Sequence, residues 1–527
     1  MLQRRWLYPI VVVLLLGQMA FAMVTTAVQQ SPTIDEPVYV GVAEVYAQQH
    51  SLRYNPEHPP LAKLFMAAGM AFEDAKLDPG FQGNQSLLGR HLLYESGNNP
   101  FRLLLAARLP MIALTLLIGL VVLFFARDLA GPWAGLVALA LYAFSPDVIA
   151  HGSLATLDVP AAGFLLTTFW LLWRAREKPG RYLPLAGLAL GAALATRAST
   201  LPAVPLALAL VFLFYRAKWT WRDVAARLGA AVAVGLIAVA TVWLVYLAVD
   251  PRLRWTTPAG LPNPGGLRGL AVDLLPFPQA YRDGVLIQFK FETQTFNGFL
   301  LGEAYKGSRW YYLPAALLIK TPLGMIALWI AGTVTLLLKK WVAALYTLVP
   351  AGVLMLVAMT GARDYGSRYV IFMPMFLGVV AGTVVLIRWK YAWVPATVLV
   401  AFVAVSSLRT FPYYLPYSNE AFGGTANTHN NLHDSNVDWG QDLPRLATTI
   451  KQRYPGERVW LVYKGGGAPG YYGLRLPNPL AVPLDQVRGI VVVSDSRVAL
   501  AQNQLKRLID SSTEIGQVGY SMTIYRR

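Results

Sequence analysis

Long apolar runs, separated by short polar segments, dominate about the first three-quarters of the chain. A run of about 20 apolar residues is long enough to cross the hydrocarbon core of a bilayer. By this measure the sequence predicts eleven membrane spans, of which the fourth to sixth are short. They lie near residues 6–28, 105–126, 133–150, 159–173, 182–196, 200–215, 228–249, 314–338, 341–360, 369–387 and 391–408.

Lysine and arginine are distributed unevenly over the segments that connect these spans. If the N-terminus is inside, the short outer loops carry only Arg197, Arg363 and Arg368, and the remaining loop cations lie inside. Cytoplasmic loops of membrane proteins are enriched in these residues. We therefore predict a cytoplasmic N-terminus and an extracytoplasmic C-terminal segment.

The first span has an alternative interpretation. Arg4 and Arg5, the apolar run after them and the sequence Ala20-Phe21-Ala22 resemble a signal peptide with its cleavage site. The run is closer in length to a full span than to the short apolar region of a signal peptide. We expect residues 1–22 to be retained, and cleavage would leave the outer loops unchanged.

Three larger segments lie on the outer side: residues 29–104, 250–313 and 410–527. The last contains patterns of a small α/β domain, with buried strands and two amphipathic helices. The strands are expected at Val459–Tyr463, Gly489–Val493 and Tyr520–Tyr525, and the helices at Leu443–Gln452 and Arg497–Leu508. The predicted fold is a polytopic α-helical membrane protein of about 11 transmembrane helices over residues 1–409. A small soluble α/β domain over residues 410–527 follows on the outer face.

The composition fits a membrane protein and excludes several other classes. Hydrophobic residues make up 55% of the 527 residues and charged residues 14%, against about 25% charged in soluble domains. This shortage of charge excludes a cytosolic enzyme and a disordered protein, and the absence of cysteine excludes a disulfide-stapled domain. The net charge of +17 predicts no nucleic-acid binding, because the loop cations follow membrane orientation.

Two adjacent acids follow the first span directly, at Asp35 and Glu36 within the segment Ser31–Pro37. Charged side chains beside a membrane need water, a partner or a chemical role. Acids also suit the first turn of a helix, and Pro37 suits an early helical position. The pair is therefore either a helix start or part of a site.

A second polar motif, Asn55–Lys63, contains His58 and Lys63 around two prolines. It places a cation and an imidazole at the start of an apolar segment, which suits a lipid phosphate. The alternative is a loop that ends in a helix with a snorkelling lysine.

Further charges stand at the outer ends of several spans. Asp158 lies in the turn between the third and fourth spans. Arg102 and Arg108 lie at the second span, Arg197 in the turn between the fifth and sixth, and Arg368 before the tenth. Arginines in such positions can anchor a helix in the interface. Their convergence with acids on one side of the membrane also predicts a site.

These motifs, in this order, resemble those of the GT-C fold membrane glycosyltransferases of glycosyltransferase family 39. That group includes protein O-mannosyltransferases, aminoarabinose transferases and bacterial phospholipid carrier-dependent glycosyltransferases. The resemblance rests on Asp35-Glu36, His58-Pro59-Pro60 with Lys63, Thr156–Pro160, Gly307–Pro314, Lys320-Thr321-Pro322, Gly366–Tyr369, Tyr417–Glu420 and Asp434–Leu443. The inserted sugar-binding domain of the eukaryotic members is absent, and the tail differs from that of the aminoarabinose transferases.

The resemblance implies an inverting transfer from a polyprenyl-phosphate-linked sugar to a hydroxyl acceptor, on the outer face of a bacterial inner membrane. It implies Asp35 as general base, Glu36 in ordering or acceptor contact, and Asp158 in positioning the sugar or an arginine. Phosphate-binding candidates are Lys63, Arg102, Arg108 and Arg368, because such cations bind phosphate by charge-assisted hydrogen bonds. His58, Asp438 and Trp439 are candidates on the substrate side. Asp438 and Trp439 equally suit a helix N-terminus packed on the membrane domain.

No cofactor is expected to be required. A divalent metal is possible but unassigned, because Glu57, His58 and His151, or His429, His433 and Asp434, lack the spacing of a zinc motif. The main alternatives are a transporter or flippase of lipid-linked sugars and a non-catalytic subunit of a glycan assembly complex. A transporter would place its charges near the bilayer midplane rather than at the outer ends of spans. The residues identify neither the sugar nor the acceptor.

Overall fold

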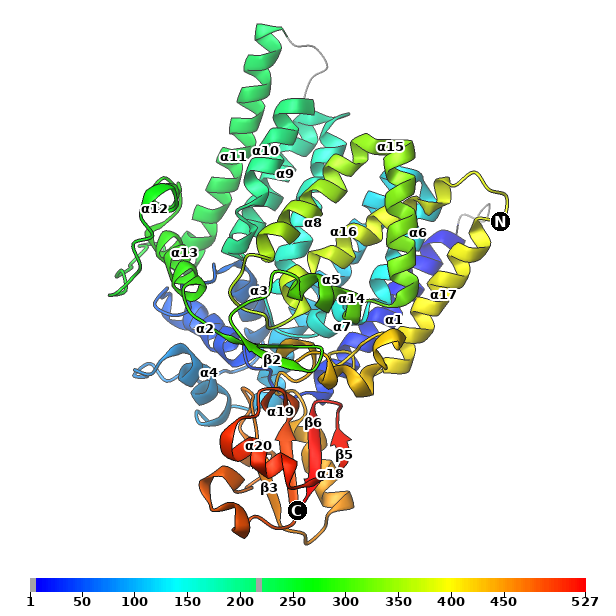
Figure 1. The fold of residues 1–527 in the computed structure, drawn as a ribbon. Helices are drawn as coiled ribbons and strands as arrows, with labels where there is room; N and C mark the ends of the chain where they lie inside the picture. The colour runs from blue at the N-terminus through cyan, green and yellow to red at the C-terminus, as the bar shows by residue number, and fades with distance from the viewer. Residues whose placement is uncertain (1–5, 215–219) are drawn as a thin grey trace.

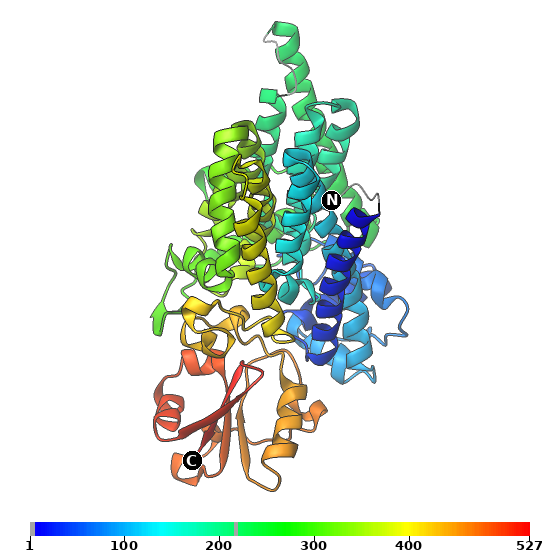
Figure 2. The same ribbon diagram turned by 90° about the vertical axis from the view of Figure 1, so that its right-hand side faces the viewer.

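The computed structural model describes residues 6–214 and 220–527. Most of this part of the chain forms an elongated helical bundle, with a sheet-containing segment at one end (Figures 1 and 2). The bundle helices are α1 (Leu7–Gln29), α5 (Pro100–Ala130), α6 (Pro132–Ala143), α7 (Pro146–Gly152), α8 (Asp158–Ala175), α9 (Pro179–Leu194), α10 (Ala203–Phe214), α11 (Trp221–Val249), α14 (Tyr312–Lys320), α15 (Leu323–Ala358), α16 (Phe372–Ala381) and α17 (Trp393–Thr410).

Five helices in the described ranges are individually long and apolar enough to cross a membrane: α1, α5, α11, α15 and α17. The number rises to six if α6 and α7, which are bent by 63° relative to each other, count as one span. A polytopic helical protein is therefore confirmed. The number eleven stays a prediction, because α9, α10 and α16 are shorter than a full span.

Two predicted spans, 314–338 and 341–360, overlap the single element α15. This helix leaves helical geometry at Lys340 (φ −147°, ψ 49°), and the ribbon turns over at this point, at the end of the bundle away from the sheet (Figure 1). The predicted break between the two spans is therefore present as a kink. The predicted start at residue 314 falls instead within the separate helix α14.

The predicted outer segments contain short elements. Residues 29–104 form α2 (Glu36–Gln49), α3 (Leu61–Met70) and α4 (Gln85–Tyr94). Residues 250–313 form α12 (Gly266–Asp273), α13 (Gln279–Glu292) and the antiparallel hairpin of β1 (Asn297–Leu300) and β2 (Glu303–Lys306). Pro37 stands in the first turn of α2, so the predicted helix start after Asp35 is present.

The C-terminal segment contains a four-stranded sheet of order β3-β4-β6-β5. The strands are β3 (Val459–Val462), β4 (Ile490–Ser494), β5 (Thr513–Val518) and β6 (Met522–Arg526), and the helices are α18 (Leu443–Arg453), α19 (Asp495–Ala499) and α20 (Asn503–Asp510). Strands β3 and β4 are parallel and the other pairs antiparallel. Alternate residues of β3 enter two apolar clusters, one on each face of the sheet.

Two details of this segment differ from the prediction. The helix expected over Arg497–Leu508 is divided into α19 and α20 by a break at Leu500–Gln502. Strand β5 was not predicted, because its sequence Thr513–Val518 is mostly exposed and lacks a buried apolar pattern. That residues 410–527 form an independent domain outside the membrane stays a prediction.

Candidate functional site

Four charged side chains from separate segments meet at the end of the bundle that faces the sheet. We call Asp35, Asp158, Arg197 and Arg368 the central cluster. Nη1 of Arg368 lies 2.7 Å from Oδ2 of Asp35 and 3.9 Å from Oδ2 of Asp158, and Nη1 of Arg197 donates to Oδ1 of Asp158. Asp35 lies directly before α2, and Asp158 is the first residue of α8. Arg197 follows α9, and Arg368 lies in the short helix η2 (Ser367–Val370).

Asp35 is the most accessible member of the central cluster. Its side chain is 25% exposed, whereas those of Arg368, Arg197 and Asp158 are 10%, 15% and 2% exposed. A carboxylate that is partly open to solvent can accept a proton from a bound hydroxyl group. The arginines beside it are suited to an anionic group, because guanidinium donors match phosphate oxygens.

His58 lies beside the central cluster, with its ring against Tyr39 of α2 at a centroid distance of 5.9 Å. Burial, followed by the nearby charges of Arg197, Lys63, Arg363 and Arg368, holds the pKa of His58 well below its ordinary value. The imidazole is therefore neutral near pH 7 and can donate or accept one hydrogen bond.

Lys63 supports the His58 loop instead of facing the cluster. Its ammonium group donates to the backbone oxygen of Asn55 (3.2 Å), to Oδ1 of Asn55 (2.9 Å) and to the backbone oxygen of His58 (2.7 Å). Burial lowers the pKa of Lys63 to about 7. An ammonium group has three donors, and these three acceptors use all of them. The structure therefore corrects the predicted phosphate contact: Lys63 supports this loop.

Arg368 is held between aromatic rings. Its guanidinium carbon lies 4.3 Å from the ring centroid of Trp439 and 5.0 Å from that of Tyr369. Trp439 is 1% exposed, and its other contacts include His151 at a centroid distance of 6.0 Å. The ring of Trp439 thus has no open face for a sugar, and the structure corrects its predicted role to positioning Arg368 through a cation–π contact.

A buried polar network fixes the backbone next to Arg368. Ser367 donates its hydroxyl to Asp147 (2.7 Å) and its backbone N–H to Oδ1 of Asn436 (2.9 Å), while Lys320 pairs with Asp147 at 3.2 Å. The motifs Lys320-Thr321-Pro322, Gly366–Tyr369 and Asp434–Leu443 therefore meet in space. Buried charges of this kind are stable only when paired and hydrogen-bonded, so the network holds η2 in one position.

Glu36 points away from Asp35 and pairs with Arg108 of α5. Nε and Nη2 of Arg108 each lie 2.7 Å from an oxygen of Glu36. Burial opposes the charged form, but the charge and hydrogen bonds of Arg108 and the N–H groups of Thr33 and Ala155 hold the pKa of Glu36 below its ordinary value. Glu36 is fully buried, so it orders the loop and does not contact an acceptor, which corrects that part of its prediction.

Arg108 has no donor left for a phosphate. Besides Glu36, its guanidinium donates to the backbone oxygens of Ala27, Gln30 and Ser31, so each of its five N–H groups has an acceptor. The side chain is 1% exposed. The structure therefore corrects the predicted phosphate contact: Arg108 joins α5 to the end of α1 and to the loop before α2.

Asp438 lies inside the contact between the Asp434–Leu443 run and α19. Its carboxylate accepts the backbone N–H groups of Gly440 (3.1 Å) and Ser496 (3.2 Å), and burial raises its pKa to about 7. Asp438 is fully buried, and the structure corrects its predicted substrate contact to an internal one.

Arg102 lies outside the central cluster. Its side chain is 69% exposed and pairs with Glu73 at 3.2 Å, in the manner of a surface ion pair. The structure thus corrects its predicted phosphate contact.

Metal ligands stay unassigned. Within residues 6–214 and 220–527, no three His, Asp or Glu side chains are grouped closely enough to hold a metal ion. Among the residues considered for one, Glu57 accepts a hydrogen bond from Gln85 (2.7 Å), and His429 lies against Gln517.

Two residues of the site were not among the candidates from the sequence. Arg197 was placed among the converging arginines but not among the phosphate-binding candidates, although its position in a very short turn between two apolar spans was the available signal. Tyr39 gave no signal, because an aromatic residue in an apolar helix is usually part of the core. Its neighbourhood is apparent only in the structure, where its ring lies against that of His58 at a centroid distance of 5.9 Å.

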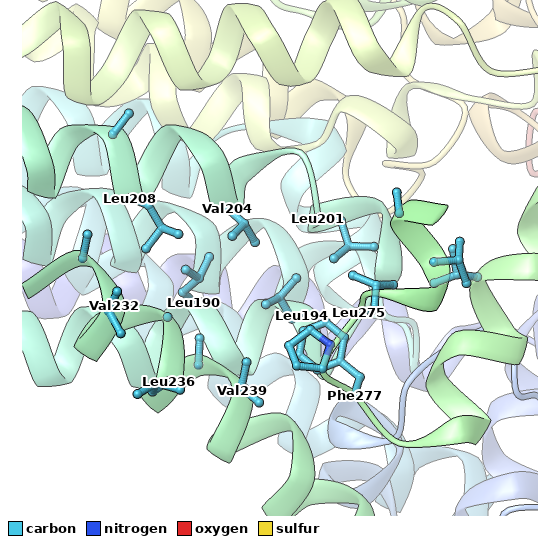
Figure 3. A pocket seen from close by; sticks show the side chains of 18 of the residues that line it. Leu190, Leu194, Leu201, Val204, Leu208, Val232, Leu236, Val239, Leu275 and Phe277 are labelled. Carbon is cyan, nitrogen blue, oxygen red and sulfur yellow. The ribbon is translucent and has the colours of Figure 1, made fainter. Parts of the chain in front are cut away.

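A large apolar cavity of about 970 Å³ lies beside the bundle, lined by side chains of α9, α10, α11, α12 and α13 (Figure 3). Figure 3 shows Leu190, Leu194, Leu201, Val204 and Leu208 on the helices α9 and α10 and the turn between them, which line one part of the cavity. Leu194 and Leu201 flank Arg197 in the chain. The turn that carries Arg197 thus contributes Leu201 to the lining of the cavity.

Comparisons with known proteins define the class. Residues 102–244 match the family model described as dolichyl-phosphate-mannose-protein mannosyltransferase. The crystal structure of ArnT from Cupriavidus metallidurans in the apo state matches with a TM-score of 0.50 at 15% sequence identity, over 98% of this chain and 97% of that chain. No curated protein sequence matches this chain significantly.

Two further solved structures have lower scores. The same ArnT bound to undecaprenyl phosphate gives a TM-score of 0.42 at 14% identity, over 98% of this chain and 97% of that chain. The oligosaccharyltransferase of Archaeoglobus fulgidus in the apo form gives 0.47 at 12% identity, over 93% of this chain and 70% of that chain.

The match to ArnT in the apo state and the family-model match confirm the resemblance that the motifs indicate. This chain has the GT-C fold of membrane glycosyltransferases. With its long apolar helices, it is a multi-pass membrane protein.

Proposed function

We propose that this protein is an inverting glycosyltransferase that moves a sugar from a polyprenyl-phosphate carrier to a hydroxyl acceptor on the outer face of a bacterial inner membrane. The observation that carries the proposal is the central cluster, in which an accessible carboxylate and two arginines meet. The turn that carries Arg197 also contributes Leu201 to the lining of the apolar cavity. The acceptor is a protein, a lipid or a glycan.

The reaction assigns a role to each member of the cluster. The acceptor oxygen attacks the anomeric carbon, the bond from that carbon to the phosphate oxygen breaks, and the phosphate leaves with the electron pair. Asp35 takes the proton of the acceptor hydroxyl group. Arg368 and Arg197 stabilise the departing phosphate, and Asp158 orients both arginines.

Arg368 has the donor capacity that this role needs. Its Nη1 is engaged by Asp35, but its buried Nε has no hydrogen-bond partner among residues 6–214 and 220–527. A buried donor without a partner is costly, and a phosphate oxygen would satisfy it.

The apolar cavity supports a lipid-linked donor. Its lining is mostly leucine, valine, alanine and phenylalanine side chains, which suits an isoprenoid chain. A carrier chain packed against Leu201 would have its phosphate near the turn that carries Arg197. Arg268 is the charged residue among the lining residues, so the lining has few groups that could bind a nucleotide sugar. We propose the isoprenoid chain of the donor as the occupant.

A reconstituted assay tests the proposed function. The purified protein in proteoliposomes receives a panel of polyprenyl-phosphate sugars, with and without a metal chelator, and native mass spectrometry searches for a co-purified polyprenyl phosphate. We expect a bound carrier and donor turnover that persists with the chelator, since no cofactor is expected to be required. Movement of intact donor across the bilayer without cleavage of the sugar–phosphate bond would contradict the proposal and favour a flippase.

Arg368→Lys should weaken donor binding about 10-fold. Lysine keeps the charge but loses the planar donor set that spans Asp35 and the phosphate, and a hydrogen bond to a charged group contributes about 1.5–3 kcal/mol. Donor affinity measured by titration tests this, with the exposed Arg102→Lys as control. If Arg368→Lys and Arg102→Lys bound the donor with equal affinity, Arg368 would only anchor its helix at the membrane interface.

Single-cysteine labelling tests the proposed orientation, since the chain contains no cysteine. A membrane-impermeant thiol reagent applied to intact spheroplasts should label Ser511→Cys, on the sheet segment, and should not label Thr220→Cys before lysis. Both positions are exposed, whereas Ser435 in the same C-terminal segment is buried and unsuitable. The reverse labelling would place the central cluster on the cytoplasmic side and overturn the proposed sidedness.

A further inference from the structure

Three consecutive glycines, Gly465, Gly466 and Gly467, follow β3 directly, and the proposed mechanism does not use them. We call them the triglycine turn. The structure places this turn against the loop that carries Asp35. A Cβ atom on Gly466 would lie 2.5 Å from the backbone oxygen of Thr33 and 2.9 Å from Cγ of Pro37. Both distances are too short for any side chain, so the backbone of the turn packs directly on this loop.

The other side of the triglycine turn packs on the Asp434–Leu443 run. A Cβ atom on Gly465 would lie 2.7 Å from Cα of Gly440. Gly440 has a positive φ of 88°, a conformation that favours glycine. The turn thus packs on both the Asp35 loop and the run that contains Trp439.

Hydrogen bonds join the same two segments directly. The backbone N–H of Ser31 donates to the oxygen of Gln441 and that of Ile34 to the oxygen of Trp439, both at 3.0 Å. The Ser31 hydroxyl donates to the oxygen of Gly440 at 2.9 Å. Three donors of Ser31 and Ile34, just before Asp35, therefore depend on the position of the Asp434–Leu443 run.

The loop is also held from the opposite direction. A Cβ atom on Gly89 of α4 would lie 1.8 Å from the backbone oxygen of Pro37. Pro37 is therefore packed between α4 and the triglycine turn. The loop that carries Asp35 has little room to move, although Asp35 itself stays partly exposed.

We infer that the triglycine turn is a positioning element, in which Gly466 sets the place of the Asp35 loop against Arg368. Trp439, on the run behind the turn, packs against the guanidinium of Arg368, so one C-terminal layer fixes both partners of the 2.7 Å ion pair. The catalytic consequence rests on the proposed function, whereas the positioning of the loop can be measured without it.

The test compares Gly466→Ala with Gly470→Ala. Gly470 is four residues away, is exposed, and has no atom within 4 Å of a Cβ. Hydrogen–deuterium exchange of residues 30–36 should become at least 10-fold faster in Gly466→Ala and stay unchanged in Gly470→Ala. In the transfer assay, kcat of Gly466→Ala should fall about 10²-fold with little change in donor KM, as for a small displacement of reacting groups.

Two further variants keep the inference testable if Gly466→Ala does not fold. Ser31→Ala removes the hydroxyl bond to Gly440 and the bond that the hydroxyl accepts from the backbone N–H of Leu443. It keeps the backbone bonds of this loop, and should speed exchange of residues 30–36 by a smaller factor. Gly467→Ala alters the same turn but would meet the flexible end of Leu443 at 2.7 Å, and should leave the exchange of residues 30–36 unchanged.

The outcomes separate this inference from the proposed function. Unchanged exchange of residues 30–36 in both Gly466→Ala and Ser31→Ala, or equal changes in Gly470→Ala, would overturn it. Faster exchange in Gly466→Ala with no loss of kcat would also overturn it, because the turn would then have no effect on Asp35. If the unaltered protein transfers no sugar, the proposed function fails, and the exchange data alone decide on positioning.

Discussion

Asp35→Asn should lower sugar transfer by about 10²–10⁴-fold, the usual contribution of a general base, while the donor still binds. Asn keeps the shape of the side chain and its hydrogen bond to Arg368 but cannot take up the acceptor proton. The structure supports this choice of residue, because Asp35 is the accessible carboxylate of the central cluster and Asp158 is buried.

Initial rates in proteoliposomes and donor affinity measured separately test this expectation. Asp78→Asn is a matched control, since Asp78 is an exposed acid of the same segment, residues 29–104. Full activity of Asp35→Asn would refute the proposed base. If donor binding were lost as well, Asp35 would be a binding residue, and Asp158 would become the candidate base.

The segments of the site could be predicted from the sequence because charge is rare in this chain. A carboxylate or guanidinium at the end of an apolar span needs a partner. This reasoning selected Asp35, Asp158 and Arg368, which the structure brings together. It could not tell which charges would pair with one another, because pairing depends on how distant helices pack.

Glu36 and Arg108 show this limit clearly. In the sequence, two adjacent carboxylates cannot be distinguished by their chemistry. The direction of α2 relative to α5 decides their partners: Glu36 is buried against Arg108, and Asp35 pairs with Arg368. Trp439 shows it in another way. A tryptophan among polar residues suits sugar stacking, but here its ring faces a guanidinium.

The fold was predictable to a similar extent. Apolar runs indicated the positions of the bundle helices, since hydropathy is local. The division of those helices was predictable only in part. The kink of α15 at Lys340 falls at the predicted break between two spans, whereas the bend of 63° between α6 and α7 lies inside the single predicted span 133–150.

Glu36→Gln should lower the free energy of unfolding by about 3–5 kcal/mol, the usual cost of breaking a buried ion pair. The amide cannot neutralise Arg108, whose guanidinium is fully buried and joins α5 to the end of α1 and the loop before α2. Because the loop also carries Asp35, transfer should fall, but less per folded molecule than in Asp35→Asn.

Glu44→Gln on the same helix is the matched control. Glu44 is also buried, but its carboxylate accepts a hydrogen bond from the neutral amide of Gln48 at 2.8 Å, and burial raises its pKa above the ordinary value. A neutral amide therefore replaces it at little cost. Unfolding by denaturant in detergent compares the two variants.

A double variant that combines Glu36→Gln with Arg108→Met tests the pair itself. Its loss in the free energy of unfolding should be smaller than the sum of the losses of the two single variants, because the two side chains interact directly. Equal stability of Glu36→Gln and Glu44→Gln would show that the Glu36–Arg108 pair does not hold the Asp35 loop.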